Sequence, residues 1–244
     1  HGTIRANWSM TRRVAGIGDC GYNRGVLQDE LKKIIQGEVR TDEETLQKFS
    51  HDTSLLQVRP EVVVAPKDRE EVKKLVRYVS ERKREGENVS ITARSGGSDM
   101  SGGPLGESVI LDCTPHLNHF SVDVSGLSVT TEPGVFFHDF EKHIEGSGIL
   151  FAPYPASKGL AAFGGMVMNN CAGEKTLRYG QMRKFVEELK MILADGDEYS
   201  FGALSPQELV EKKMQSDPEF AAKMRDIGDV GNIGLFVLDA VGLG

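Results

Sequence analysis

A glycine-rich run at Arg94–Gly103 is the part of the sequence whose residue types point most directly to ligand chemistry. It reads R-S-G-G-S-D-M-S-G-G, with four glycines among short hydroxyl and carboxyl side chains. Glycine permits positive φ and lets a ligand approach the backbone closely, and successive N–H groups in such a turn form a concave anion site. We therefore interpret the run as a site for a phosphate or pyrophosphate. A plain surface turn is the alternative.

A second glycine-rich run lies further along the chain. It begins as P-Y-P-A-S-K at 153–158 and continues as F-G-G-M-V-M-N-N-C-A-G at 163–173. Gly164 and Gly165 would let the backbone approach a flat ligand, and the amides of Asn169 and Asn170 can bond to ring heteroatoms. A tightly packed turn with a buried strand is the alternative. The two runs together favour a ligand site more strongly than either does alone.

Two common phosphate-binding signatures are absent. The dinucleotide pattern G-x-G-x-x-G starts at Gly146 but has Phe151 at the third glycine position. The ATP-loop pattern G-x-x-x-x-G-K-[ST] fails because Glu174 separates Gly173 from Lys175. An NAD-binding Rossmann site and a kinase are therefore disfavoured.

The elements before the first run place it at the end of a strand. The apolar run 62–65 is typical of a buried strand, and 89–93 predicts a second strand leading into Arg94. Between them, Asp68 and Glu71 fit a capping box, followed by the helical stripe Val72, Leu75, Val76 and Val79. This is a β-α-β unit, and ligands of parallel sheets lie at the carboxyl ends of strands.

The rest of the chain reads as short helices and strands. We expect helices at 26–35, 43–49, 135–144 and from Ser205, and strands at 109–111, 120–124, 127–131 and 185–193, the last followed by a hairpin turn at 194–198. Residues 1–25 read as a loosely ordered leader. The apolar run 235–241 would normally pack against a following segment, so we expect the chain to be a fragment of a longer protein.

Composition narrows the class further. The 244 residues carry a formal net charge of −7, which disfavours nucleic-acid binding. Three scattered cysteines without a C-x-x-C pair support neither a disulfide framework nor a zinc ribbon, and they favour a reduced, cytoplasmic setting. His116 and His119 have no third ligand nearby, so we expect no metal site. No apolar run approaches the roughly 18 residues that a membrane span needs.

Several motifs then occur in an order that resembles one family. They are R-S-G-G-S-D-M-S-G-G, E-P-G-V, P-Y-P-A-S-K, G-G-M-x-x-N-N-x-x-G, L-R-Y-G and A-D-G, spread over roughly 26–201. Together they resemble the PCMH-type FAD-binding domain of vanillyl-alcohol oxidase-like flavoproteins, in the D-lactate, glycolate and D-2-hydroxyglutarate dehydrogenase branch. The resemblance implies an α+β fold with two lobes, an N-terminal β-α-β lobe and a second, mainly antiparallel sheet. It also implies an N-terminal helical segment at 26–57 and a C-terminally incomplete FAD-binding domain at 58–244.

The resemblance also implies which residues hold FAD. The pyrophosphate would lie on Arg94, Ser95, Gly96, Gly97, Ser98, Asp99, Met100 and Ser101. The pyrophosphate and isoalloxazine side would be lined by Pro155, Ser157, Gly164, Gly165, Asn170 and Gly173. Ser98 stands where relatives with covalent FAD often have histidine, so the resemblance implies non-covalent FAD. Met166 and Ala172 replace an Asn and a Gly of the common family pattern, which changes the details of flavin contact.

The function implied is that of an FAD-dependent oxidoreductase acting on a CH–OH group, with a D-2-hydroxy acid such as lactate, glycolate or 2-hydroxyglutarate as substrate. No catalytic side chain can be named in this chain, and the substrate domain is expected beyond Gly244. The electron acceptor is open. Two alternatives remain: a non-catalytic or truncated nucleotide-binding module, and an NADPH/FAD enzyme similar to UDP-N-acetylenolpyruvoylglucosamine reductase.

Overall fold

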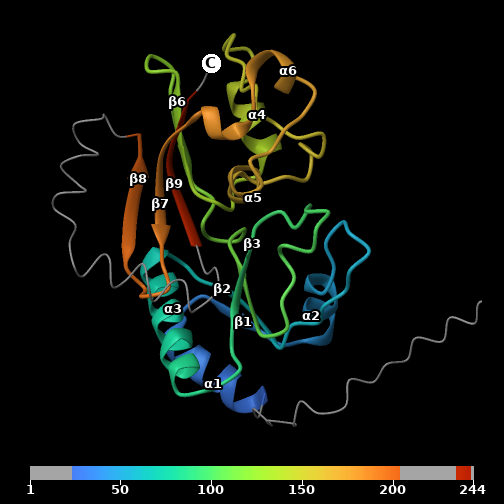
Figure 1. Ribbon diagram of the computed structural model, residues 1–244, viewed down its shortest axis with the longest axis vertical. Coiled ribbons are helices and arrows are strands. Elements are labelled where there is room, and N and C mark those ends of the chain that lie inside the picture. The colour runs from blue at the N-terminus through green and yellow to red at the C-terminus, as the bar shows by residue number, and fades with distance from the viewer. Residues whose placement is uncertain (1–23, 204–234, 243–244) are drawn as a thin grey trace, which may run out of the picture.

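The computed structural model describes residues 24–203 and 235–242, and it has two lobes with one sheet each (Figure 1). The predicted leader and the predicted helix from Ser205 lie outside these ranges, apart from the last residues of the leader. The first lobe contains α1 (Arg24–Ile34), β1 (Glu38–Arg40), α2 (Glu43–Phe49), β2 (Val62–Ala65), α3 (Arg69–Arg84), β3 (Ile91–Arg94) and β4 (Val109–Asp112). No helix in the described ranges is long and apolar enough to cross a membrane.

The first sheet confirms the predicted β-α-β unit and adds a strand inside it. Its order is β1-β2-β4-β3, with β4 parallel to both β2 and β3 and β1 antiparallel at the edge. Val62 and Val64 face the core under α1 and α3, whereas Val63 faces a smaller core under α2. Side chains alternate across a strand, so an all-apolar strand is needed where both faces are covered. The short strand β1, with the sequence E-V-R, was not predicted.

Half of the predicted capping box forms at the start of α3. The Asp68 side chain accepts the Glu71 N–H at 2.9 Å, which satisfies one unpaired donor of the first turn. The buried Glu71 carboxylate does not return this bond to Asp68. It accepts the N–H groups of Gln36, Gly37 and Lys67 instead, and so ties the end of α1 to the start of α3.

The second lobe is built on a five-stranded antiparallel sheet in the order β5-β6-β9-β7-β8. Its strands are β5 (Phe120–Asp123), β6 (Ser128–Thr131), β7 (Val186–Ile192), β8 (Glu198–Gly202) and β9 (Leu235–Gly242). The apolar run at 235–241 was expected to pack against a following segment. The structure places its backbone within the sheet: β9 pairs with the earlier strands β6 and β7 and fills the middle of the sheet.

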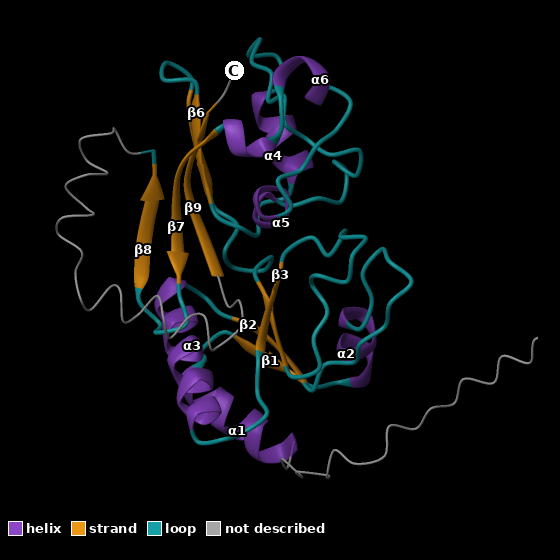
Figure 2. Ribbon diagram, viewed as in Figure 1, coloured by secondary structure: helices purple, strands orange, loops and turns teal. Residues whose placement is uncertain are grey.

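Helices gather on one side of the second sheet (Figure 2). They are α4 (Phe137–Ile144), α5 (Phe163–Met168), α6 (Thr176–Tyr179) and the 3₁₀ turn η1 (Met182–Lys184). Four buried rings, Phe137, Phe140, Phe151 and Phe163, contact one another with centroids 5.3–6.2 Å apart. The sequence did not predict α5, because six residues with two glycines show no helical stripe. This aromatic cluster holds α5 in place.

The β7–β8 hairpin joins the two lobes. Its predicted turn is confirmed, and the turn contacts α3: Asp197 pairs with Arg77 at 2.8 Å, and Glu198 lies 3.4 Å from Arg69. The Ser80 hydroxyl donates to the Ala194 carbonyl at 2.5 Å. Ile192 at the end of β7 is fully buried in the core of the first lobe. The lobes are therefore fixed relative to one another on the side of α3.

Candidate cofactor site between the lobes

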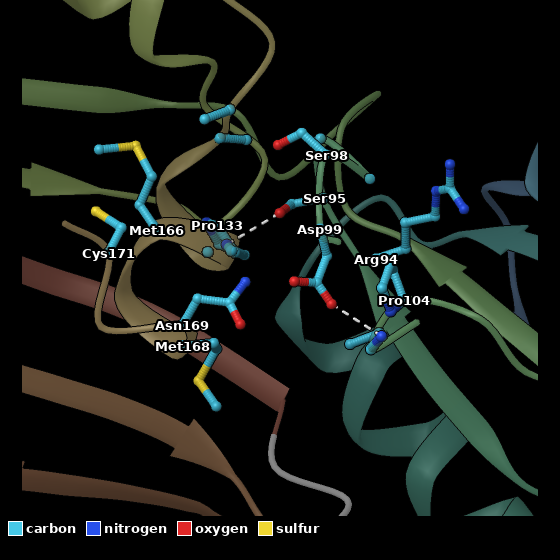
Figure 3. A pocket seen from close by; sticks show the side chains of 18 of the residues that line it. Arg94, Ser95, Ser98, Asp99, Pro104, Pro133, Met166, Met168, Asn169 and Cys171 are labelled. Carbon is cyan, nitrogen blue, oxygen red and sulfur yellow. Dashed lines mark hydrogen bonds between the residues drawn. The ribbon is translucent and has the colours of Figure 1, made fainter. Parts of the chain in front are cut away.

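A cavity of about 700 Å³ lies where the two glycine-rich runs meet (Figure 3). This volume is within the 300–1,000 Å³ usual for cofactor and small-molecule sites. The first run contributes every residue from Arg94 to Met100 and also Gly103 to the lining. The second contributes Pro155, Ser157, Ala161, Ala162, Gly164, Gly165, Met166, Met168, Asn169, Cys171 and Ala172. The structure thus brings together the two glycine-rich runs, which are about 50 residues apart in the sequence.

The turn Ser95–Ser98 presents free backbone donors. Within the described part of the chain, none of its four consecutive N–H groups donates a hydrogen bond. Gly97 has φ +65°, a left-handed conformation that glycine adopts without strain and that curves successive N–H groups into a concave anion site. Donors of this kind can be satisfied by the acceptor oxygens of a bound ligand. The turn therefore suits a phosphate or diphosphate.

The start of α5 differs from this turn, because the protein itself uses its donors. Phe163 and Gly164 donate their N–H groups to the carbonyls of Val135 and Pro133, both at 2.9 Å. The Gly165 N–H donates to the Ser95 hydroxyl at 3.0 Å, so that this bond connects the two glycine-rich runs. The anion-binding capacity of the cavity hence lies in the first run.

The glycines around the cavity have different reasons for lacking a side chain. A Cβ on Gly96 would lie 2.4 Å from the Leu160 carbonyl oxygen, and one on Gly164 would lie 2.7 Å from Pro133. Gly96 is therefore required by close packing between the two runs, and Gly164 by close packing of α5 against Pro133. A Cβ on Gly165 would meet only the Ser95 hydroxyl, at 3.3 Å. Gly165 is the glycine whose missing side chain leaves space in the cavity.

The Arg94 side chain is turned away from the cavity (Figure 3). Its guanidinium donates to the His51 carbonyl at 2.7 Å and stands 5.0 Å from the centroid of the Phe49 ring. Burial lowers its pKa, and the charges of Asp112 and Asp52 act in the opposite direction. Arg94 thus lines the cavity with its backbone, while its charged group fastens the run to the end of α2.

Two carboxylates close the turn that follows. Asp99 accepts the Ser101 hydroxyl at 2.7 Å and the Gly103 N–H at 2.9 Å, and Asp52 accepts the Gly102 N–H at 2.9 Å. Burial acts to raise the pKa of Asp99, but these hydrogen bonds outweigh it and hold the pKa below its usual value. Ser101 serves this turn and lies outside the cavity lining.

Asn170 and Gly173 also lie outside the lining. Asn170 has φ +45°, and its amide bonds to the Gln181 side chain at 3.1 Å and to the Arg183 N–H at 2.9 Å. Gly173 is required by packing, because a Cβ there would lie 2.0 Å from the Tyr154 carbonyl oxygen. These contacts give both residues a structural role in the loop after α5.

Sequence reasoning missed part of the lining. Pro133 belongs to the E-P-G-V motif, for which we expected no ligand contact, yet it lines the cavity and its carbonyl accepts the Gly164 N–H. Pro104, Leu105 and Cys113 line it from the first lobe, and no sequence pattern marked them. Cys171 lines it as a buried thiol 3.2 Å from the Pro153 carbonyl, and burial raises its pKa to about 12.

The fold and the cavity define a class of protein. Over 88% of the chain, the structure superposes on 39% of the solved alkyldihydroxyacetonephosphate synthase with a TM-score of 0.67 at 19% identity, a likeness of fold. Two lobes with an anion-binding turn between them are the architecture of a PCMH-type FAD-binding domain, as the motifs implied. Residues 60–202 match the FAD binding domain family. The chain belongs to this family, and FAD is its cofactor.

Characterised relatives are longer than this chain. It is 31% identical over 153 residues to a protein named glycolate oxidase subunit GlcD from Bacillus subtilis, which covers 61% of the chain and 31% of that protein. It is 30% identical over 173 residues to a D-lactate dehydrogenase from Archaeoglobus fulgidus, covering 69% of the chain and 37% of that enzyme. The chain thus spans about a third of the length of each of these two relatives.

Proposed function

We propose that this chain is the flavin-binding part of an FAD-dependent oxidoreductase that oxidises a D-2-hydroxy acid such as glycolate, lactate or 2-hydroxyglutarate. The observation that carries the proposal is the row of four N–H groups at Ser95–Ser98 that have no hydrogen-bond acceptor among the described residues, in a cavity of about 700 Å³. The names of the related proteins from Bacillus subtilis and Archaeoglobus fulgidus support this substrate class.

The proposed role of the first run is to hold the diphosphate of FAD. Its backbone supplies the donors, and the full set of proposed contacts in this run is Arg94, Ser95, Gly96, Gly97, Ser98, Asp99, Met100 and Ser101, with the Arg94 side chain and Ser101 acting by shaping the turn. Gly165 leaves room for the flat part of the cofactor. Pro155, Ser157 and Gly164 line the same side, with Asn170 and Gly173 holding the loop behind them.

The proposed FAD is non-covalent. A covalent link to the flavin needs a nucleophilic side chain in the cavity, and Ser98 supplies only an alcohol where the covalent pattern has histidine. The Cys171 thiol is neutral at physiological pH because burial raises its pKa to about 12. Neither group is activated for attack.

When bound at Ser95–Ser98, FAD would supply the redox chemistry, as the acceptor of a hydride equivalent from the hydroxylated carbon. The residues of this chain bind and orient the cofactor. We place the catalytic groups in a substrate domain outside this chain, and we place the enzyme in the cytoplasm, a setting that suits the buried free thiols Cys113 and Cys171.

Absorption spectroscopy tests the proposal. The purified chain incubated with FAD and desalted should keep the flavin band near about 450 nm, and acid precipitation should release all the flavin into the supernatant. Flavin retained in the acid pellet would show a covalent link. A colourless protein whose melting temperature FAD does not raise would contradict the cofactor role. Anaerobic bleaching of the band by D-lactate, glycolate or D-2-hydroxyglutarate, with L-lactate as control, tests the substrate class in the presence of the substrate domain.

A further inference from the structure

Thr53 lies outside the cavity lining yet contacts the run that forms it. Its N–H donates to the Asp99 carbonyl at 3.0 Å. Its hydroxyl lies 2.7 Å from the Asp99 carbonyl oxygen and 3.1 Å from that of Ser98. Thr53 is itself exposed, so these contacts are separate from the packing of a core.

These contacts set the orientation of the peptide groups at the end of the donor row. The peptide bond is planar and trans, so its C=O and N–H point in opposite directions. Thr53 holds the Ser98 carbonyl toward itself, and the N–H of Asp99, in the same plane, therefore points away from Thr53. No hydrogen bond from this N–H forms within the described ranges. The Asp99 N–H is therefore a fifth donor that continues the row Ser95–Ser98, with no acceptor in the described ranges.

The neighbouring residues of the same loop keep Thr53 in place. Asp52 accepts the Ser54 N–H at 2.8 Å and the Gly102 N–H at 2.9 Å, and the His51 carbonyl accepts the Arg94 guanidinium. The loop 51–54 is thus joined to the Arg94–Gly103 run near both ends of that run, at Arg94 and at Gly102. Because the loop is held in this way, the Thr53 hydroxyl has a fixed position relative to the turn Ser95–Ser98.

We propose that Thr53 is a positioning residue for the diphosphate of FAD: its hydroxyl holds the Ser98 and Asp99 carbonyls, and so fixes the two peptides at the end of the donor row in the curvature of a diphosphate. This inference rests on the proposed function. It assigns a role to a surface threonine in a loop that carries no glycine or phosphate signature.

The test compares Thr53→Val with Thr53→Ser and with Thr130→Val, which alters an exposed threonine of β6 whose hydroxyl makes no hydrogen bond in the described structure. Dissociation constants for FAD (flavin fluorescence) and ADP (calorimetry) and the melting temperature without ligand are measured on the full chain. Loss of one orienting hydrogen bond should weaken Thr53→Val for both ligands by about tenfold. Thr53→Ser and Thr130→Val should bind like the unaltered chain, and all unliganded melting temperatures should agree.

Three results would overturn the proposal. Thr53→Val could bind FAD and ADP as tightly as the unaltered chain. It could lose FAD affinity only in proportion to a fall in its unliganded melting temperature, which would make Thr53 a stability residue. Thr53→Ser could bind as weakly as Thr53→Val, which would show that the hydroxyl is not the cause. If the unaltered chain binds no FAD, the proposed function fails first, and this inference fails with it.

Discussion

The two glycine-rich runs look alike in sequence but act differently in the structure. In the first, Arg94–Gly103, the N–H groups of Ser95–Ser98 have no acceptor among residues 24–203 and 235–242, while side chains behind the run hold its shape. The second forms α5, whose first N–H groups are all bonded within the protein and whose Gly164 is required by packing against Pro133. In the function we propose, the first run offers its donors to the ligand, whereas the donors of the second are used within the protein. A cluster of glycines therefore predicts that the backbone lies close to another group, but not whether that group is a ligand or another part of the protein.

The largest effect should come from filling the contact between the runs. Gly96→Ala would place a methyl group 2.4 Å from the Leu160 carbonyl oxygen, and backbone atoms cannot move aside as a side chain can. We expect the free energy of unfolding to fall by about 1–3 kcal/mol, the usual cost of overpacking, together with a loss of FAD binding. Urea denaturation measures the first effect and flavin absorption the second. Unchanged stability would show that the lobes are not in close contact at Gly96.

Gly165→Ala should separate binding from stability. A Cβ there meets only the Ser95 hydroxyl at 3.3 Å, and alanine is favoured over glycine in a helix by roughly 0.5–1 kcal/mol. We expect stability within about 1 kcal/mol of the unaltered chain, because the helix gain offsets the close contact. The methyl group occupies cofactor space, and FAD affinity should fall by roughly tenfold, the effect of about 1.4 kcal/mol. If Gly165→Ala lost stability and FAD affinity together, Gly165 would be a packing glycine like Gly96 and not one that leaves space for the cofactor.

Ser95→Ala removes the hydrogen bond that joins the two runs. The Gly165 N–H would lose its acceptor at 3.0 Å, at a cost of about 1 kcal/mol in unfolding free energy. Thermal and urea unfolding measure this loss. Ser121→Ala, at an exposed serine of β5 without a side-chain hydrogen bond in the described structure, is the matched control. Equal stabilities of the two variants would mean that the bond contributes nothing to closing the cavity.

The smallest effect concerns pH and the turn closed by Asp99. Its pKa lies below the ordinary 3.8 in the folded chain, so its contribution to stability is complete above that value and is lost as the pH falls through the lowered pKa. Stability of Asp99→Asn should therefore depend less on pH below about 4 than that of the unaltered chain.

Asp123→Asn is the control for Asp99, because Asp123 closes the β5–β6 turn with similar bonds and also has a lowered pKa. Both variants should lose pH dependence, but only Asp99→Asn should weaken FAD binding, as measured by flavin fluorescence. If Asp123→Asn weakens it equally, the effect is one of general stability.

The sequence predicted those parts of the fold that rest on local patterns. The apolar run of β2, the stripe of α3 and the turn between β7 and β8 are all set by neighbours in the chain. It did not predict β1 or α5, because E-V-R carries no periodicity and α5 depends on an aromatic cluster assembled from distant residues. The position of β9 was missed because strand pairing across long sequence separations leaves no local pattern.

The sequence predicted the glycines of the cavity, but not the directions in which the longer side chains point. The sequence brought Arg94 and Asn170 to attention as polar groups near a ligand, yet the guanidinium bonds to His51 and the amide to Gln181. Those partners lie in polar segments without any marked pattern. The direction of a long side chain depends on which carbonyl or amide the fold brings near, and that is a tertiary property.

The place of β9 has a consequence for synthesis of the chain. Its partners β6 and β7 end at Thr131 and Ile192, but β9 begins at Leu235. A nascent chain therefore carries two separate hairpins, β5–β6 and β7–β8, and isolated hairpins are marginally stable in water. Until β9 leaves the ribosome, β6 and β7 each expose an edge that can pair with another chain. The first lobe has β2, β3 and β4 within 62–112 and needs only Ile192 of β7 to complete its core, so we expect it to fold earlier in translation than the second lobe.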